Sequence, residues 1–425
     1  MIFKRDYYIN KLINNKNNSF IKVITGIRRC GKSYLLFNLY YNYLLSIGID
    51  KKHIIAINLE NDEYENLYDR TKLREYIKSK IVDNKQYYLF LDEIQNVQNF
   101  EKMLNGLNQL QNLDIYVTGS NSKFLSTDII TEFRGRSYEI RVYPLSFAEF
   151  FTGFDGEKTE ALMQYMLYGG MPALNELKTS KDKSIYLKNL FDTVYLKDIM
   201  ERYKIKNIEE INEIINFVSS SIGSLTNPTK LEHSFESIKN IKISKVTIQK
   251  YLNYLKDSFL IDSATRYDIK GKRYINTPLK YYFTDVGLRN VRIDFRQYEQ
   301  THLMENIIFN ELKIRDYNVD IGVVEINTKN KKGVSQRKQL EVDFVCNQGN
   351  KRYYIQSAFA IPDEEKMRQE TNSLVKIKDS FKKIVVVNDD SPVWRNNDGI
   401  LIINIKNGIR TRTGTETIIF KKRNS

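Results

Sequence analysis

An octapeptide near the start of the chain constrains its fold more than any other feature. Residues 26–33, GIRRCGKS, match the phosphate-binding pattern G-x-x-x-x-G-K-[ST], or Walker A motif, at every fixed position. The glycines of such a loop let its backbone N–H groups surround a phosphate, the lysine reaches between the β- and γ-phosphates, and the serine hydroxyl can hold Mg²⁺. We therefore expect ATP and Mg²⁺ to bind here. The residues expected at the nucleotide are Gly26, Ile27, Arg28, Arg29, Cys30, Gly31, Lys32, Ser33 and Tyr34, with Ser33 also on the metal.

The sequence on either side of this loop has the pattern that a Walker A motif requires. Residues 20–24 are apolar and typical of a buried strand, and residues 34–39 are typical of the first turns of a helix. A strand, a phosphate loop and a helix in this order support the motif. The alternative interpretation is an ordinary glycine turn in front of a helix.

A second acidic motif follows further along the chain. Apolar residues 53–59 predict a strand and residues 73–82 a helix, and a second apolar strand over 88–91 ends in Asp92 and Glu93. This is the Walker B pattern, in which Asp92 would hold the water shell of Mg²⁺ and Glu93 would polarise the water that attacks the γ-phosphate. The alternative is a strand end that exposes two acids. Alternating strands and helices up to about residue 150 predict a parallel sheet with helices on both faces.

Polar and basic residues after the next strand suggest further catalytic groups. Residues 114–118 predict a third strand, and Ser120 and Asn121 just beyond it fit the position of a sensor of the γ-phosphate, between which the sequence does not choose. Arg134 and Arg136 precede a last strand over 138–142. Either could be an arginine finger that acts from a neighbouring subunit, and we therefore expect a homo-oligomer on ATP binding. A solvated basic loop is the alternative.

Residues 20–150 resemble the AAA-type ATPases of bacteria and archaea that carry a C-terminal domain of unknown function numbered 4143. The resemblance rests on GIRRCGKS, FLDEIQ, TGSNS, RGR and PLSFAEF, and it continues in YGGMP at 168–172, YLKDI at 195–199 and YFTDVGLR at 282–289. It covers nearly the whole chain. It implies ATP chemistry more firmly than it implies a biological role.

Composition limits the class of protein. A chain of 425 residues is long enough for two to four domains. Two cysteines, Cys30 and Cys346, and three histidines argue against a disulfide framework and against a zinc site. No apolar run is long enough to cross a bilayer and no signal peptide is apparent, so we expect a cytoplasmic protein without a membrane partner. The net charge of +14 suits nucleic acid, although an AT-rich genome would produce a similar composition.

The middle of the chain predicts a winged-helix region. Residues 155–208 predict helices that link or cover the nucleotide site. Residues 209–298 then predict three helices, at 211–222, 230–235 and 244–255, followed by strands at 259–262 and 272–275 around a basic turn. In a winged helix the third helix can enter the major groove of DNA while the hairpin meets phosphates.

The third helix should begin at Ser244 as its N-cap and bury one face. The residues expected to face a core are Val246, Ile248, Tyr251, Leu252 and Leu255, and those expected to face DNA are Lys245, Lys250, Lys270, Lys272 and Arg273. A module that contacts only protein is the alternative.

Residues 299–406 resemble the restriction-endonuclease-like nuclease core. A helix over 301–312 precedes strands at 319–327, 339–346 and 352–358, a helix at 364–378 and a closing strand at 383–387. The resemblance implies that Glu305, Asp343 and Gln356 project together as a metal site. Ala358 stands where that family has its catalytic lysine, so we expect a nuclease shape without nuclease chemistry, unless a lysine such as Lys351 or Lys366 moves into the site. The basic tail, 407–425, resembles nothing that we recognise.

The sequence therefore predicts an α/β protein with five parts: an AAA-type ATPase domain over 1–154, a helical linker or lid over 155–208, the winged-helix region, the degenerate nuclease-like domain and the tail. We expect its nucleotide state to control assembly and DNA engagement. The alternatives are an ATP-dependent DNA nuclease and a regulatory ATPase that binds only protein.

Overall fold

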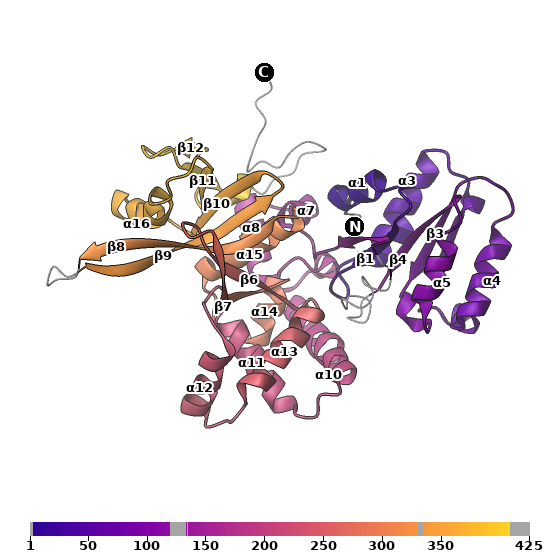
Figure 1. The fold of residues 1–425 in the computed structure, drawn as a ribbon, viewed down its shortest axis with the longest axis horizontal. Helices are drawn as coiled ribbons and strands as arrows, with labels where there is room; N and C mark the ends of the chain where they lie inside the picture. The colour runs from indigo at the N-terminus through magenta and orange to yellow at the C-terminus, as the bar shows by residue number, and fades with distance from the viewer. Residues whose placement is uncertain (1–2, 120–132, 134, 330–334, 409–425) are drawn as a thin grey trace, which may run out of the picture. The chain divides into compact units, whose positions relative to one another are not determined.

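The computed structural model describes residues 3–119, 133, 135–329 and 335–408 (Figure 1). The chain divides into two compact units. The first contains residues 1–145 together with 257–259, and the second contains 146–256 together with 260–425. Among the described residues, no helix has both the length and the apolar character needed to cross a membrane.

The first unit is built on a five-stranded sheet in which every pairing is parallel. Its strands lie in the order β2-β3-β4-β1-β5. The strands are β1 (Ile21–Thr25), β2 (Ile54–Asn58), β3 (Tyr87–Asp92), β4 (Leu113–Thr118) and β5 (Ser137–Arg141). Because β4 lies between β1 and β3, the strand that enters the glycine loop and the strand that ends in Asp92 are both its neighbours.

Helices cover both faces of this sheet (Figure 1). Side chains of α4 and α5 pack on one face in an apolar cluster with the inward residues of the strands. On the other face, Tyr40 contacts the rings of Phe90 and Tyr116. The helical segments are α1 (Asp6–Asn14), α2 (Lys32–Tyr34) continued by a π-helical stretch (Leu35–Tyr40) and α3 (Tyr41–Ser46), then α4 (Arg70–Lys80) and α5 (Phe100–Leu107). Short 3₁₀ turns span Lys51–His53, Asp62–Leu67 and Ile94–Asn96. The predicted parallel sheet with helices on both faces is confirmed.

The second unit begins with a run of helices and ends in an α/β layer. Its first helices are α7 (Phe147–Thr152), α8 (Lys158–Tyr168), a 3₁₀ turn (Pro172–Glu176), α9 (Ser180–Asn189), a π-helical stretch (Leu190–Leu196) and α10 (Lys197–Tyr203). The later helices are α11 (Ile208–Ser220), α12 (Pro228–Lys239), α13 (Lys245–Asp257), α14 (Val286–Arg292), α15 (Gln300–Ile314), α16 (Glu364–Val375) and α17 (Ile405–Gly408). The expected helical character of 155–208 is thus present.

One eight-stranded sheet runs through the second unit in the order β12-β13-β11-β10-β9-β8-β6-β7. Its strands are β6 (Ile261–Asp268), β7 (Arg273–Phe283), β8 (Asn318–Lys329), β9 (Ser335–Gln348), β10 (Lys351–Ala358), β11 (Lys382–Val387), β12 (Trp394–Arg395) and β13 (Leu401–Asn404). The hairpin of β6 and β7 joins the later strands because β6 pairs in parallel with β8. Both hairpin strands are longer than predicted, and β6 has a partner on each side, β7 and β8.

Several elements differ from the sequence-based expectation. The strand expected to close the sheet, β11, is not at its edge: β13 pairs with β11 in parallel, and the short β12 pairs with β13. Ser244 caps α13 as predicted, accepting a hydrogen bond of 3.2 Å from the backbone N–H of Thr247. Ile248, Tyr251, Leu252 and Leu255 are buried, but the expectation for Val246 is wrong because its side chain is 70% exposed. Two residues before Ile248, it points to the opposite side of the helix.

Two of the motifs that carried the family resemblance meet in the second unit. Asp285 caps the first turn of α14 by accepting from the N–H of Leu288 at 3.1 Å, and it accepts from the N–H of Gly170 at 2.7 Å. A Cβ on Gly169 would lie 2.1 Å from Asp285 Oδ1, so the close approach needs glycine there. Burial raises the pKa of Asp285 to about 6. Through its bonds to Gly170 and Leu288, the Asp285 carboxylate joins two segments that lie more than a hundred residues apart in the sequence.

Candidate functional site

The glycine loop lies between the end of β1 and the start of α2. Gly26 has a φ of 138°, and a Cβ there would lie 2.1 Å from the carbonyl oxygen of Val142, so only glycine fits. Gly31 has a φ of 98°, a value that favours glycine. Lys32 is buried, and its Nζ donates to the carbonyl oxygens of Gly26 at 2.9 Å and Ile27 at 3.1 Å. The ammonium of Lys32 is therefore held by carbonyl oxygens of the glycine loop.

The remaining residues of the loop divide into a core side and a solvent side. Ile27 and Cys30 are buried, and the Cys30 thiol donates to the carbonyl of Val142 at 3.4 Å. Arg29 has a φ of 63° and is exposed, as are Ser33 and Tyr34. The thiol on the core side contacts the residue that follows β5, whereas Arg29, Ser33 and Tyr34 lie on the solvent side of the loop.

Ser33 and Asp92 come together at the carboxyl edge of the sheet. The Ser33 hydroxyl lies close enough to the Asp92 carboxyl group to favour its ionised form. Burial raises the pKa of Asp92 above its ordinary value, opposed by the hydrogen bond from Thr118 and by the nearby Ser33 hydroxyl. A hydroxyl and a carboxylate oxygen are ligands that Mg²⁺ prefers, so these residues fit the metal that the sequence predicts.

Two polar residues that we did not predict complete this edge. The Thr118 hydroxyl donates to Asp92 Oδ1 and accepts from the backbone N–H of Glu93 at 3.4 Å. The side-chain amide of Gln95 donates to Glu93 Oε2. Glu93 itself has a φ of 51°, a left-handed conformation that is uncommon outside glycine. A signal for Thr118 existed, since it is the polar last residue of the strand beside β3.

The predicted sensor and finger residues have different outcomes. Ser120, Asn121 and Arg134 lie outside the described residues. Arg136 is exposed and immediately precedes β5, where Ser137 pairs with Ile21 at the amino-terminal end of β1. The glycine loop follows the other end of β1, five residues and roughly 16 Å away. Arg136 therefore lies beside the end of β1 that is opposite to the glycine loop.

A glycine loop after β1, acids at the end of β3 and a strand between them define a P-loop nucleotide-binding fold of the AAA type. Residues 18–151 match a family model described as an AAA domain. Residues 159–299 match a model described as a domain of unknown function, DUF8612. The domain number 4143 that the resemblance implied is not confirmed.

Two relatives extend this likeness over most of the chain. An uncharacterized protein of Haemophilus influenzae is 35% identical over 391 residues, which are 91% of this chain and 93% of that protein. An uncharacterized protein of Methanocaldococcus jannaschii is 31% identical over 406 residues, 92% of this chain and 86% of that protein. The chain belongs to the family of these proteins, and in this chain an AAA domain is joined to a domain of unknown function that follows it.

Solved structures show a more distant likeness. The Aeropyrum pernix ORC1 protein, solved in complex with DNA, is 8% identical, and the match covers 69% of this chain and 92% of that chain with a TM-score of 0.29. A likeness at this level carries no argument about function.

The residues expected to face DNA are all exposed. Lys245 and Lys250 lie on α13, and Lys270, Lys272 and Arg273 lie at the turn between β6 and β7. Arg273 is paired with Asp268 at 3.3 Å, and Lys270 donates to the backbone carbonyl of Glu325. Gln249 and Asn253, which we did not predict, share the exposed face of α13 and are joined by a hydrogen bond of 3.1 Å. This face therefore combines cations with amide groups.

The residues expected at the nuclease-like site surround a lysine that the sequence analysis did not identify. Lys280 of β7 lies between Glu305 of α15 and two acids of β9, Glu341 and Asp343. Gln356 accepts a 3.4 Å hydrogen bond from the backbone N–H of Asp343. Burial lowers the pKa of Lys280, but the three carboxylates outweigh it and raise the pKa above its ordinary value. Burial, reinforced by Glu305, raises the pKa of Asp343 well above its usual range.

Neither lysine that we named as a substitute lies in this cluster. Lys351 is exposed at the start of β10. Lys366 forms an ion pair with Glu370, one turn further along α16. Lys280 is 25 residues before Glu305 and belongs to the hairpin, so no local pattern pointed to it.

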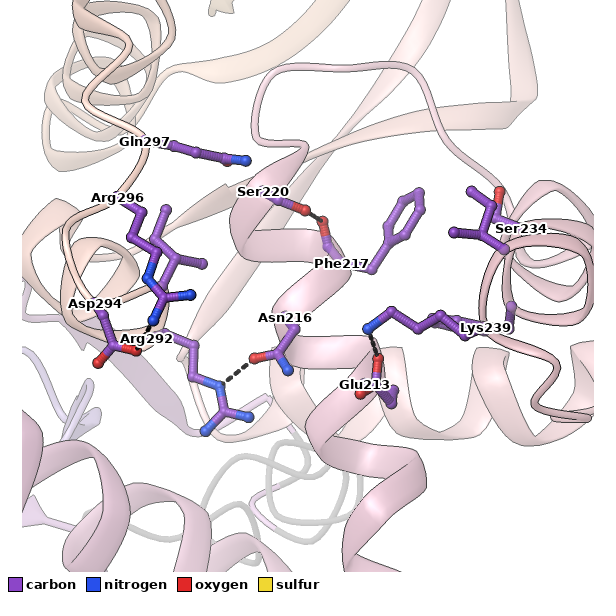
Figure 2. Close-up of a pocket in the computed structure, with 13 residues that line it drawn as sticks. Glu213, Asn216, Phe217, Ser220, Ser234, Lys239, Arg292, Asp294, Arg296 and Gln297 are labelled. Atoms are coloured by element: carbon purple, nitrogen blue, oxygen red, sulfur yellow. Dashed lines mark hydrogen bonds and ion pairs between the residues drawn. The ribbon is translucent and has the colours of Figure 1, made fainter.

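A cavity of about 460 Å³ lies between α11, α12 and the segment that follows α14 (Figure 2). Phe217 stands in its wall, where its ring packs against Phe235. Its cations are engaged within the wall: Lys239 with Glu213, Arg292 with Asn216 at 2.8 Å, and Arg296 with Asp294 at 3.8 Å. The wall therefore indicates no particular ligand.

Proposed function

We propose that this chain binds Mg-ATP at the loop between β1 and α2, hydrolyses it, and uses its nucleotide state to control self-assembly and the engagement of DNA. The observation that carries the proposal is the meeting of Ser33, Asp92 and Thr118 at one edge of the sheet. Ser33 and Asp92 would hold Mg²⁺, which when bound supplies Lewis-acid stabilisation of charge on the phosphates.

The side chains of this edge have separate tasks in the proposed reaction. Lys32, held in the loop by two carbonyl oxygens, would place its charge against the β- and γ-phosphates. Glu93 would accept a proton from the attacking water or orient it. Because Gln95 donates to Glu93 in the structure, that contact must loosen or include the water when Glu93 acts.

The order of elements in residues 208–283 supports the DNA part of the proposal. Helix α11 is followed by Thr226, which pairs with Leu279 of β7 through hydrogen bonds of 2.8 and 2.9 Å, and then by α12, α13 and the hairpin. This is the order of a winged helix, in which α13 would be the recognition helix. Its exposed lysines and amides suit phosphates and base edges.

Two variants test the nucleotide part directly. Lys32→Ala should weaken ATP binding, because it removes the charge that faces the phosphates. Glu93→Gln should bind ATP normally and lower turnover by about 10²-fold or more, as expected for loss of a general base. Binding of a fluorescent ATP analogue and release of phosphate measure the two effects. Normal turnover in Glu93→Gln would refute the role of Glu93.

A further experiment separates this proposal from its alternatives. The purified chain, with and without a slowly hydrolysed ATP analogue, is measured for mass and for duplex DNA binding in the same sample. We expect a larger assembly and salt-dependent DNA binding that change with nucleotide. Assembly without any DNA affinity would favour a regulatory ATPase that binds only protein.

A further inference from the structure

The topology of residues 300–387 raises the question of a metal site outside the nucleotide loop. Helix α15 is followed by the antiparallel strands β8, β9 and β10, then by α16 and by β11 parallel to β10. This order is that of the restriction-endonuclease-like core, whose acids hold Mg²⁺. The corresponding residues here are Glu305 and Asp343, with Glu341 two positions before Asp343 on β9.

The contacts of Lys280 answer this question. Its Nζ lies 2.6 Å from Glu341 Oε1, 3.0 Å from Glu305 Oε1 and 3.8 Å from Asp343 Oδ1. All three acids thus point their oxygens at one ammonium, as ligands would point at a cation. The side chain of Lys280 is only 4% exposed, so the amine faces protein.

Two oxygens of the cluster also have partners other than Lys280. Glu305 Oε1 accepts a second hydrogen bond from the hydroxyl of Tyr282 at 2.7 Å, and Asp343 Oδ2 accepts from the N–H of Ser357 at 2.8 Å. The Gln356 side-chain oxygen is turned to the backbone of Asp343. With Lys280 between them, the three acids do not form a group that could hold a metal ion as they stand, and the described part of the chain has no other such group of His, Cys, Asp or Glu.

We infer that the ammonium of Lys280 stands in for the divalent cation of the nuclease-like core, so that Glu305, Glu341 and Asp343 hold a lysine instead of Mg²⁺. A divalent ion placed among these acids would be repelled by the positive charge of the ammonium at hydrogen-bond distance. If the lysine side chain moved away, three buried or half-buried carboxylates would be left without a countercharge. The same geometry argues against Lys280 as a catalytic lysine, because its amine faces the three acids and not solvent.

Removal of the ammonium should therefore create a metal site. Mn²⁺ binding is measured by electron paramagnetic resonance on the full chain without nucleotide, which keeps the nucleotide loop from adding a strong site. Lys280→Met should retain about one Mn²⁺ more per chain than the wild type, because hard cations take carboxylate oxygens. Adding Asp343→Asn should abolish that gain. Lys313→Met, which removes a lysine of the same helix as Glu305 but outside the cluster, is the matched control and should gain nothing.

A second arm uses the wild type and does not depend on the folding of any Lys280 variant. Wild-type Mn²⁺ binding should be the same as that of Glu305→Gln, and the wild type should cut neither plasmid nor linear DNA with Mg²⁺ or Mn²⁺, with or without ATP. Two results would overturn the inference: a folded Lys280→Met chain that gains no Mn²⁺, or wild-type Mn²⁺ binding or DNA cleavage that disappears in Asp343→Asn. If Lys280→Met does not fold, the wild-type arm decides alone.

Discussion

The hydroxyl of Thr118 donates a hydrogen bond to Asp92 Oδ1 and accepts one from the backbone N–H of the next residue, Glu93. It joins the end of β4 to the two acids that end β3. A single hydroxyl therefore orients the carboxylate proposed to hold Mg²⁺ and the backbone that sets the direction of the proposed general base.

Thr118→Val, which removes only this hydroxyl, should raise the pKa of Asp92 further, because a hydrogen bond that lowers it is lost. Mg²⁺ requires the ionised carboxylate, so Mg-ATP affinity rises with pH through this pKa, and the rise should move to higher pH in the variant. Turnover should fall about tenfold or more, as for loss of one oriented polar group. Thr118→Ser should restore both. Titrations of Mg²⁺-dependent ATP binding over a pH series measure the shift, and identical curves for the Val variant and the wild type would contradict this role.

Gly26→Ala should abolish ATP binding while leaving the rest of the sheet folded. The added Cβ would lie 2.1 Å from the carbonyl oxygen of Val142, and alanine rarely adopts a φ of 138°. Gly106→Ala in α5 is the matched control, because its Cβ meets nothing within 4 Å. That change should be neutral or stabilise by about 0.5–1 kcal/mol through helix propensity. Circular dichroism and nucleotide titration on both variants make the comparison, which fails if both bind ATP equally.

Arg136, or Arg134, should act across a subunit boundary. Lys32→Ala and Arg136→Ala should each be inactive, and mixing the two should restore part of the hydrolysis, because one interface would then combine an intact loop with an intact arginine. Loss of a finger lowers turnover by about 10³-fold or more in ATPases and GTPases generally. Phosphate release from mixed samples is the measurement. No recovery in an assembly shown to exchange subunits would exclude a role in trans.

Lys250 and Lys272 should contact the phosphates of duplex DNA. Replacing both with Ala should weaken binding to all sequences alike and lower the slope of log affinity against log salt by roughly one unit per lost contact. Lys376→Ala with Lys378→Ala, which removes two exposed lysines after α16, should leave the slope unchanged. Fluorescence anisotropy across a salt series gives the slopes. Equal slopes for the two double variants would leave the winged-helix region as a protein-contact module.

Asp285 should make the stability of the second unit depend on pH. Its pKa is about 6 in the folded chain and about 3.9 when unfolded, so the folded state binds the proton more tightly between these values. The free energy of unfolding that this group contributes therefore falls as pH rises through that window, by about 3 kcal/mol at most. Asp285→Asn does not titrate, so the stability of the wild type relative to this variant should fall from pH 4 to 6. Thermal melts of both proteins measure the difference, and a relative stability that rises with pH would show that the pKa is not raised.

Much of the first unit could be predicted because its signals are local. The Walker A loop, its flanking strand and helix, and the acids that end β3 each lie within a few consecutive residues, where apolar runs and glycine positions decide the backbone. The same reasoning located most strands and helices of the second unit. It failed for Val246, where one residue was assigned to the wrong side of a helix.

The contacts that matter most to function were decided only by the tertiary structure. Thr118 reaches Asp92 because β4 pairs with β3, Asp285 reaches Gly170 across the second unit, and Lys280 reaches Glu305 and Asp343 because the hairpin joins the later strands in one sheet. Sequence spacing limits which residues can be neighbours within one helix or strand, but it does not limit which strands pair. The sequence by itself therefore determined the chemistry available at the nucleotide loop, and strand pairing decided which distant side chains orient that chemistry and which cation fills the acidic cluster.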